Sequence, residues 1–387
     1  MLSRKVKLQL NKKQLSELKE LSSKSAEIYN NLLQVNFDRL DAGQRMLTAF
    51  DMDRLCKDIN LAPNIGTDVI QEITKRVDRV FKRWQESQQT KLKFWLQHGE
   101  AYLKPLKAYL AKAGKKLWGK PRFKTKGISI QFPLRKTDQK RVKVFGNQTS
   151  VNVPLVGKVK GRNDRQDLIG LVKHVTVSKD SCNTWWATIV CDGEAVKTEI
   201  VSRSKDIGVD LGLKHTITAA NETEVIQPER ERFIDKQIEA VRKASRRNKQ
   251  DLPFIHRKTA RRRKHSHHVQ AKRLLQAADT VIVGNLNSKF LFSGRLARSA
   301  SDAAHSQFLS ILAYKAANAG KTIKIVNEAY TSQICYRCKR RQKMELSERE
   351  YHCPCGYSNN RDVNAALNIL SIGRETTASS SEQSLRL

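Results

Sequence analysis

Long apolar runs, acidic residues and cysteines are scarce in this chain of 387 residues. No apolar run approaches about twenty residues, which excludes a membrane-spanning helix. The first residues, Met1–Lys5, lack the apolar stretch of a signal peptide, so we expect no secretory leader. Only seven cysteines are present, and four of them lie between residues 335 and 355. That distribution favours a reduced compartment and one metal site over a disulfide framework.

The shortage of acids leaves a large positive charge. Against 73 lysines and arginines stand 38 acidic residues, which gives a formal net charge of +35 and a pI of about 10.1. This surplus requires a polyanion, and nucleic acid is the obvious one, whereas a well-solvated surface alone would not need it. A ribosomal protein would also be basic, but it would not need the strand-ending acids described next. A mass of 44.2 kDa leaves room for two to four compact units.

Two acids lie at the boundaries of expected regular elements. A carboxylate at the end of an apolar strand is unusual and suggests a function. Residues 206–212 have the pattern of a hydrophobic strand that ends in Asp210, and residues 360–370 open a helix with Asp362. Between them, residues 280–286 have the pattern of a buried strand and carry no acid. Carboxylates that converge from separate elements suit two divalent ions for phosphodiester hydrolysis, because hard cations require several oxygen ligands.

A cysteine motif near the C-terminus predicts a second kind of metal site. Cys335 and Cys338 form a C-x2-C pair, and a fourteen-residue gap separates them from the C-x-C pair Cys353 and Cys355. Four thiolates at such spacing can close a tetrahedral zinc site that stiffens a unit too small for a core of its own. His352 is an alternative ligand for one position, and a loop of free thiols is the competing interpretation.

Three basic segments are candidates for contact with phosphates. Residues 51–113 are helical in pattern with one basic face, which is also compatible with a solvated bundle. Residues 115–126 interleave lysines with aromatic rings, which suits both nucleic-acid stacking and a structural loop. Residues 229–276 form a basic helical stretch whose arginine cluster could alternatively be a nuclear-localisation signal. The candidate nucleic-acid-binding residues are Lys75, Arg76, Arg79, Lys82, Arg83, Lys120, Arg122, Phe123, Lys124, Arg261, Arg262, Arg263 and Lys264.

The order of elements predicts an α+β protein of several domains. Short strands with turn residues between them over residues 128–202 indicate a small β-barrel, which the strand at 6–10 could complete, so that the helical part would be an insertion. The expected domains are a β-barrel (1–10 and 127–202), a helical domain (11–126), an α/β domain (203–334 and 357–373), a metal-binding insertion (335–356) and a disordered tail (374–387).

Three segments, Gly208–Lys214, Tyr330–Cys338 and Arg361–Ile369, resemble the RuvC-type nuclease core of the TnpB family. These are transposon-encoded RNA-guided DNA nucleases related to type V CRISPR effectors. Tyr29–Leu32 and Gly119–Lys124 resemble the N-terminal half of the family more loosely. The resemblance implies a wedge β-barrel with an inserted helical recognition domain. An RNase H-like (RuvC) nuclease domain would follow, with an inserted zinc knuckle that binds target nucleic acid.

The chain departs from the family at Gly284, where members usually carry a glutamate. One interpretation is a nuclease-inactive, RNA-guided DNA-binding protein that acts as a transcriptional repressor. In the other, the glutamate is relocated, as in a subset of TnpB proteins and the eukaryotic Fanzor proteins, and Glu328 resembles that variant. Neighbouring strands are about 5 Å apart. If the strand at 322–327 lies beside the strand at 280–286, Gly284 would leave room for Glu328 to reach the same metals. An exposed strand-end acid is the plain alternative for Glu328.

The resemblance therefore implies an RNA-guided DNA endonuclease, encoded by or derived from a transposon, with Asp210, Glu328 and Asp362 holding two catalytic Mg²⁺ ions. Its structural Zn²⁺ would be held by the four clustered cysteines. Its partners would be a guide RNA derived from the transposon end and double-stranded DNA beside a short flanking motif. Its location would be the bacterial cytoplasm and nucleoid, or the nucleus in a eukaryote. A DDE-type transposase also uses three acids, but the position of the knuckle before the last acid and the Asn-Ala-Ala helix favour the TnpB resemblance.

Overall fold

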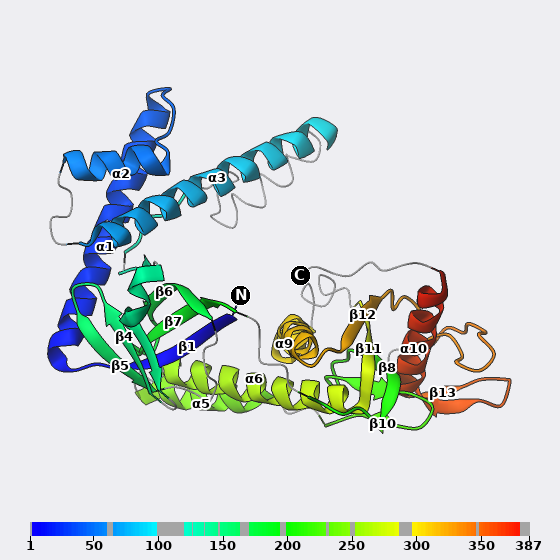
Figure 1. The fold of residues 1–387 in the computed structure, drawn as a ribbon. Helices are drawn as coiled ribbons and strands as arrows, with labels where there is room; N and C mark the ends of the chain where they lie inside the picture. The colour runs from blue at the N-terminus through cyan, green and yellow to red at the C-terminus, as the bar shows by residue number, and fades with distance from the viewer. Residues whose placement is uncertain are drawn as a thin grey trace. The chain divides into compact units, whose positions relative to one another are not determined.

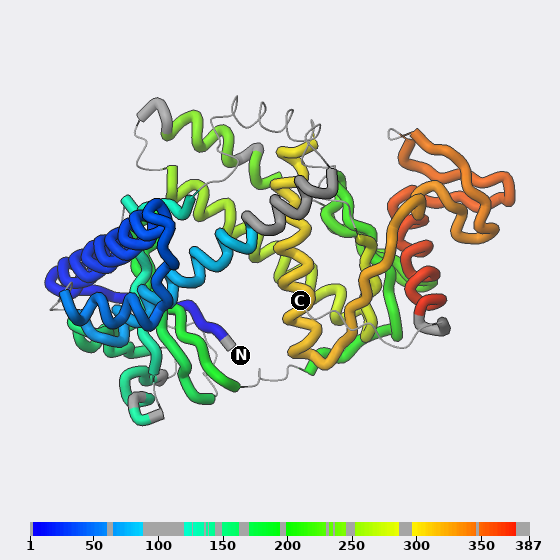
Figure 2. The backbone as a smooth tube through the Cα atoms, turned by 90° about the horizontal axis from the view of Figure 1, so that it is seen from above, coloured from blue at the N-terminus to red at the C-terminus, as the bar shows by residue number. Residues whose placement is uncertain are grey.

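The computed structural model divides into two compact units, residues 1–195 and 196–387 (Figures 1 and 2). Each unit combines a β-sheet with helices. The residues that the structure describes are 2–59, 65–98, 120–125, 127–134, 136–145, 148–162, 170–193, 199–229, 232–247, 252–285, 296–345 and 348–379. None of the helices in these ranges is both long and apolar enough to cross a membrane.

The first unit is built on a seven-stranded antiparallel sheet in the order β2-β6-β7-β1-β5-β4-β3. The strands are β1 Leu2–Gln9, β2 Ile130–Pro133, β3 Val142–Phe145, β4 Gln148–Val153, β5 Gly157–Arg162, β6 Leu171–Lys179 and β7 Trp185–Asp192. The first strand of the chain lies in the middle of the sheet, because β1 pairs with both β5 and β7. Side chains of β7 alternate between buried and half-buried positions along most of the strand, as expected when one face of a sheet covers a core.

Three helices lie between β1 and β2 in the sequence: α1 Lys12–Asp41, α2 Ala49–Asp58 and α3 Thr67–His98. Asn11 caps α1, because its side chain accepts a hydrogen bond from the backbone of Gln14 at 2.8 Å. The helix runs to Asp41. The predicted helical stretch at 51–113 divides into α2 and α3, and its part beyond residue 98 lies outside the described residues. One apolar cluster joins these helices to the strands.

The second unit contains a five-stranded sheet in the order β10-β9-β8-β11-β12. Its strands are β8 Ser204–Asp210, β9 Thr218–Ala220, β10 Val225–Ile226, β11 Ala278–Gly284 and β12 Thr322–Val326. β11 pairs in parallel with β8 on one side and with β12 on the other. The carboxyl ends of these three strands therefore lie at one edge of the sheet, where Gly284 is in register with Val326.

Three helices pack on the faces of the second sheet: α6 Leu252–Ala277, α9 His305–Asn318 and α10 Arg361–Ser379. The helices α5 Phe233–Arg247 and α8 Ala297–Ala303 belong to the same unit, and α5 packs on α6. Val281 and Val283 belong to a core with residues of α6 and α9, whereas Ile282 packs with Ile369 and Leu370 of α10. Because successive side chains of a strand point to opposite faces, α10 covers the face away from α6 and α9.

Ala304, whose left-handed backbone (φ 46°) ends α8 and begins α9, separates these two helices. One prediction about the helices of this unit was wrong. The tail expected to be disordered from residue 374 continues α10 as far as Ser379, and residues 380–387 lie outside the described part of the chain.

Candidate metal-binding and nucleic-acid-binding sites

Three acids come to the carboxyl edge of the second sheet from three elements. Asp210 is the last residue of β8, Glu328 follows the end of β12 by two residues, and Asp362 is the second residue of α10. The backbone N–H of Asp362 donates to Oδ1 of Asn360 at 3.0 Å, which caps the first turn of the helix. An acid in that turn is also stabilised by the helix dipole. The start of α10 therefore holds Asp362 at a fixed position.

Glu328 occupies the space that Gly284 leaves on the neighbouring strand. A Cβ atom added to Gly284 would lie 2.9 Å from Cβ of Glu328 and 3.0 Å from Cδ1 of Ile369, and it would overlap the Glu328 carboxylate. Cβ atoms do not approach that closely, so a side chain at position 284 and the present position of Glu328 exclude each other. Within the described part of the chain, Oε2 of Glu328 is buried and has no hydrogen-bond partner.

Asp210 is influenced electrostatically by the other two carboxylates. Burial raises the pKa of Asp210 to about 8, the charges of Glu328 and Asp362 add to the rise, and Arg361 opposes it. Burial also raises the pKa of Glu328 to about 7. Carboxylates in this situation bind a proton or a cation, because like charges close together cannot all remain ionised without one. The donor set, three carboxylates with one unpartnered buried oxygen, fits hard divalent cations.

The four motif cysteines form a tighter cluster than the carboxylates. Their sulfur atoms all lie within 4.8 Å of one another. Sγ of Cys335 is 3.7 Å from that of Cys355, and Sγ of Cys338 is 3.5 Å from that of Cys353. A tetrahedral zinc ion with Zn–S bonds of about 2.3 Å requires sulfur separations of about 3.8 Å. The cluster can therefore hold a structural metal such as zinc.

The small hairpin β13–β14 carries one pair of these cysteines. β13 is Glu350–His352 and β14 is Ser358–Asn360, and Tyr351 belongs with Cys335 and Cys353 to a separate small core. His352, the alternative ligand, is exposed, lies outside the cluster and has its Nδ1 2.9 Å from Oγ of Ser358. A backbone hydrogen bond at Arg340 and the neighbouring thiols lower the pKa of Cys338 to about 7, which favours the thiolate form that binds metal.

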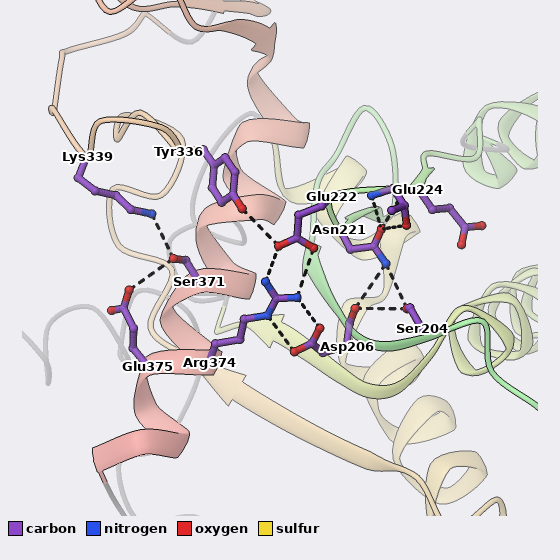
Figure 3. A network of polar contacts seen from close by, with 11 residues as sticks. Ser204, Asp206, Asn221, Glu222, Glu224, Tyr336, Lys339, Ser371, Arg374 and Glu375 are labelled. Atoms are coloured by element: carbon purple, nitrogen blue, oxygen red, sulfur yellow. Dashed lines mark hydrogen bonds and ion pairs between the residues drawn. The ribbon is translucent and has the colours of Figure 1, made fainter.

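An arginine on α10 joins three parts of the second unit, as Figure 3 shows. The guanidinium of Arg374 donates to both carboxylate oxygens of Asp206 on β8, at 2.9 and 2.6 Å. It also donates to both oxygens of Glu222, and the hydroxyl of Tyr336 donates to Glu222 at 3.4 Å. These hydrogen bonds lower the pKa values of Asp206 and Glu222. The network ties the helix that carries Asp362 to the strand that ends in Asp210.

The basic candidates on α3 are engaged to different extents within the protein. Lys75 pairs with Glu72 at 3.0 Å and Lys82 with Asp78 at 2.7 Å. Arg79 donates to the backbone oxygen of Lys75 at 3.2 Å, and Arg83 is exposed. Arg76 is half-buried and donates to Oγ of Ser129 at 3.0 Å, so it ties α3 to the chain before β2. Its hydrogen bonds and burial give Arg76 a structural role that the sequence did not indicate.

The segment Lys120–Lys124 is fixed to α1 and still presents an aromatic ring. The backbone N–H of Lys124 donates to Oδ1 of Asn30 at 2.8 Å, and Nδ2 of Asn30 donates to the Lys124 carbonyl at 2.9 Å. Phe123 is 47% exposed and its ring packs edge-on against Phe37 at 5.9 Å. Lys120 pairs with Asp41 at 3.1 Å, and Arg122 is exposed. The segment combines the two interpretations, a structural loop and a basic, aromatic surface.

On α6, the four consecutive basic residues are not equivalent. Arg261, Arg262 and Lys264 are exposed, whereas Arg263 is half-buried and donates to the backbone oxygen of Ser301 at 3.3 Å. Three of the four basic side chains are therefore exposed on α6, and Arg263 holds α6 to α8.

Several known proteins are similar to this chain in sequence. The family model described as "Cas12f1-like, TNB domain" matches residues 305–369, which include α9, β12 and the cysteine cluster. A "Putative RNA-guided DNA endonuclease" of Streptomyces pristinaespiralis is 30% identical over 217 residues, 53% of this chain and 54% of that protein. The chain thus spans about half of that relative.

Two further relatives are similar over comparable lengths. "Putative RNA-guided DNA endonuclease InsQ" of Escherichia coli is 29% identical over 289 residues, 67% of this chain and 69% of that protein. "TnpB-like protein L770" of Acanthamoeba polyphaga mimivirus is 26% identical over 232 residues, 53% of this chain and 44% of the relative.

The chain is similar in sequence to TnpB-like proteins and to putative RNA-guided DNA endonucleases. The resemblance stated from the sequence motifs is confirmed to this extent. Among solved structures, the chain resembles one titled "Cryo-EM structure of the Cas12f1-sgRNA-target DNA complex", with a TM-score of 0.57 and 14% identity. The match covers 91% of this chain and 81% of the other. The chain therefore shares its fold with the Cas12f1 of that complex.

Sequence reasoning missed several residues that organise this site. Asp206, Glu222 and Arg374 are ordinary charged residues in the sequence, and Asp206 and Arg374 meet across 168 positions of the chain. Asn364 and Asn368 are buried polar residues four positions apart on an otherwise apolar face of α10. That spacing was a usable signal, because buried amides need partners.

Proposed function

We propose that this chain is an RNA-guided, Mg²⁺-dependent DNA endonuclease, encoded by or derived from a transposon, in which Asp210, Glu328 and Asp362 hold two Mg²⁺ ions. The observation that carries the proposal is the position of Glu328, whose buried carboxylate fills the space above Gly284 at the edge where β8 ends in Asp210. A glutamate thus supplies from β12 the acid that β11 lacks, as in the relocated-glutamate variant of the family. The names of its relatives support the same activity.

Each carboxylate has a distinct part in the proposed reaction. Asp210 is half-buried near both other acids, and its pKa, raised to about 8, favours binding of a proton or of a cation that compensates its charge. Glu328 offers an oxygen without a protein partner, and Asp362 approaches from the capped start of α10. When bound, two Mg²⁺ ions would activate the attacking water and stabilise the leaving oxygen.

The proposed partners follow from charge and from the relatives. A guide RNA derived from the transposon end would neutralise much of the net charge of +35. Base pairing with that guide would read the target strand of double-stranded DNA, while the helical and sheet regions of the first unit would read a short flanking motif. The four cysteines would hold a structural Zn²⁺ in a domain that contacts target nucleic acid. We place the protein with DNA, in the bacterial cytoplasm and nucleoid or in a eukaryotic nucleus.

The test is cleavage of a matched plasmid by the purified ribonucleoprotein in the presence of Mg²⁺. Asp210→Ala, Glu328→Ala and Asp362→Ala are each expected to reduce the cleavage rate by at least about 10³-fold, because a metal with a missing ligand is poorly held. Guided binding should persist in all three, since it comes from base pairing and phosphate contacts. Glu350→Ala, which removes an exposed acid from β13, is the control and should cut normally. A wild-type protein that binds guided targets and never cuts would instead support a nuclease-inactive repressor.

A further inference from the structure

Two buried asparagines on α10 hold the chain that follows Glu328. Asn364 is fully buried and Asn368 is 3% exposed, and they lie one helical turn apart. Nδ2 of Asn368 donates to the backbone oxygens of Thr331 at 2.9 Å and of Ile334 at 2.7 Å. Nδ2 of Asn364 donates to the same Ile334 oxygen at 2.8 Å, while its Oδ1 accepts from the backbone N–H of Tyr336 at 3.0 Å.

These hydrogen bonds fix the orientation of both amides. The Tyr336 N–H is only a donor, so the oxygen of Asn364 must face it and the nitrogen must face the Ile334 carbonyl. Both partners of Asn368 are carbonyl oxygens, so only its nitrogen can face them. An apolar or acidic side chain at either position would leave buried carbonyl oxygens unpaired or repelled. The pair therefore acts as a specific clamp on residues 331–336.

The clamp is connected to Glu328 through one residue, Thr331. The backbone N–H and the hydroxyl of Thr331 donate to the backbone oxygen of Glu328, at 3.2 and 2.9 Å. Tyr330, which lies between them, has a φ of 66°, a left-handed conformation that is costly for a bulky residue. Such a conformation persists only where the surroundings over-determine it. The turn after Glu328 is thus held in an unfavourable conformation by contacts that begin on α10.

We propose that Asn364 and Asn368 are positioning residues that fix the Glu328 carboxylate with respect to Asp362. The same helix carries Asp362 two residues before Asn364, so one rigid element would place one carboxylate directly and the other through Thr331. This inference rests on the proposed function, which requires Glu328 to hold a metal ion. Glu328 lies in a turn after the end of β12, so strand pairing does not hold its backbone and the two asparagines would do so instead.

The test measures Mn²⁺ binding, by the electron paramagnetic resonance of free Mn²⁺, to zinc-loaded full-length protein without nucleic acid. Asn368→Ala is expected to weaken binding at the carboxylate site about 10–100-fold, as loss of an outer support of a metal ligand does. In the Glu328→Gln background the same substitution should change binding less than about twofold. Thr331→Val, which is close in shape and removes only the hydroxyl bond to Glu328, should show a smaller weakening with the same dependence on Glu328. It serves as the second variant if Asn368→Ala does not fold.

Asn221→Ala is the matched control. Asn221 is also buried in the second unit, and its amide holds a turn and Ser204, away from Glu328. It should leave Mn²⁺ binding unchanged even if it lowers the melting temperature. Wild-type Mn²⁺ binding that Asn368→Ala does not alter, or an equal loss with and without Glu328, would overturn the positioning role alone. A wild-type protein without a Mn²⁺ site that depends on Asp210 and Asp362 would overturn the proposed function, and the positioning role with it.

Discussion

Glu328 reaches the carboxyl edge of the sheet because the adjacent position on β11 carries no side chain. A buried carboxylate oxygen without a hydrogen bond is costly, and it is relieved by a proton or by a cation. Burial raises the pKa of Glu328 to about 7, so near neutral pH a bound metal would displace a proton from a substantial fraction of the molecules. The glycine and the glutamate form one functional feature although they lie on different strands.

A reciprocal exchange of the two residues tests this pairing. Glu328→Gly should abolish cleavage, and Gly284→Glu added to it should restore the rate to within about 10–100-fold of wild type, because both side chains would enter one site. Glu328→Ala is less suitable than Glu328→Gly as the starting variant for this exchange. The alanine keeps the Cβ atom at position 328, which would lie 2.9 Å from the Cβ atom added at position 284. Single-turnover cleavage of a matched plasmid provides the measurement.

Gly284→Ala and Gly66→Ala form the control pair for the exchange. A Cβ at Gly284 meets Glu328 and Ile369, whereas one at Gly66 meets nothing within 4 Å. We expect Gly284→Ala to lose cleavage by displacing Glu328, and Gly66→Ala to keep it. Full activity of Glu328→Gly would refute the relocated carboxylate, whatever the double variant does.

At the level of whole elements, α10 organises the second unit. It carries Asp362 in its first turn, packs its buried face on β8 and β11, and carries Arg374 in its second half. The close approach to β8 depends on Gly208, where a Cβ would meet the Ala366 carbonyl and Leu370 of the helix. This helix therefore connects the metal edge, the cysteine cluster and the sheet.

The start of α10 was predictable from its motif, and its end was not. The sequence predicts a disordered tail from residue 374 because Ser and Thr are abundant there, but Arg374 makes ion pairs with Asp206 and Glu222. Such long-range pairs leave no local signal. The break at Ala304 was unpredictable for a related reason, because alanine favours helices and gives no indication of a left-handed turn. Asp210 and Asp362, by contrast, follow from local strand and helix patterns.

Replacement of Arg374 should change stability in a pH-dependent way. Its hydrogen bonds lower the pKa values of Asp206 and Glu222 below the ordinary 3.8 and 4.5 in the folded protein. The resulting stabilisation is present above those ordinary values and is lost as the pH falls through the lowered ones. At pH 7 we expect Arg374→Gln to reduce the melting temperature of the second unit by about 2–4 °C, since partly exposed pairs contribute on the order of 1 kcal/mol.

The difference between wild type and Arg374→Gln should shrink as the pH is lowered below about 4, in thermal unfolding followed by calorimetry. Lys243→Gln removes an exposed pair with Glu239 on α5, at 2.6 Å, and should shift the melting temperature little. A destabilisation by Arg374→Gln that is equally large at pH 3 and pH 7 would show that packing, and not the charge network, is the main contribution of the arginine.

For the whole molecule, the formal charge of +35 is the property that the sequence establishes most firmly. Composition alone predicted a polyanionic partner, but it could not tell which basic side chains remain exposed. On α3, Lys75 and Lys82 pair with acids of the same helix, and Arg76 is engaged with Ser129. On α6, most of the basic cluster is exposed. Which lysines and arginines are engaged depends on packing, so only the folded chain distinguishes a phosphate-binding surface from a structural one.

The basic cluster of α6 gives the test of this distinction. Replacing Arg261, Arg262 and Lys264 together by glutamine should reduce the slope of log affinity for a structured RNA against log salt concentration by about 2–3, because each phosphate contact contributes about 0.7–0.9 to that slope. Arg263→Gln should instead lower the melting temperature while changing the slope by less than about 1, since its guanidinium is half-buried against Ser301. Both slopes can be obtained by measuring the affinity for labelled RNA by fluorescence anisotropy at salt concentrations from about 50 to about 500 mM. If the triple variant keeps the wild-type slope, these three residues of α6 do not contact the RNA, and their charge serves solubility instead.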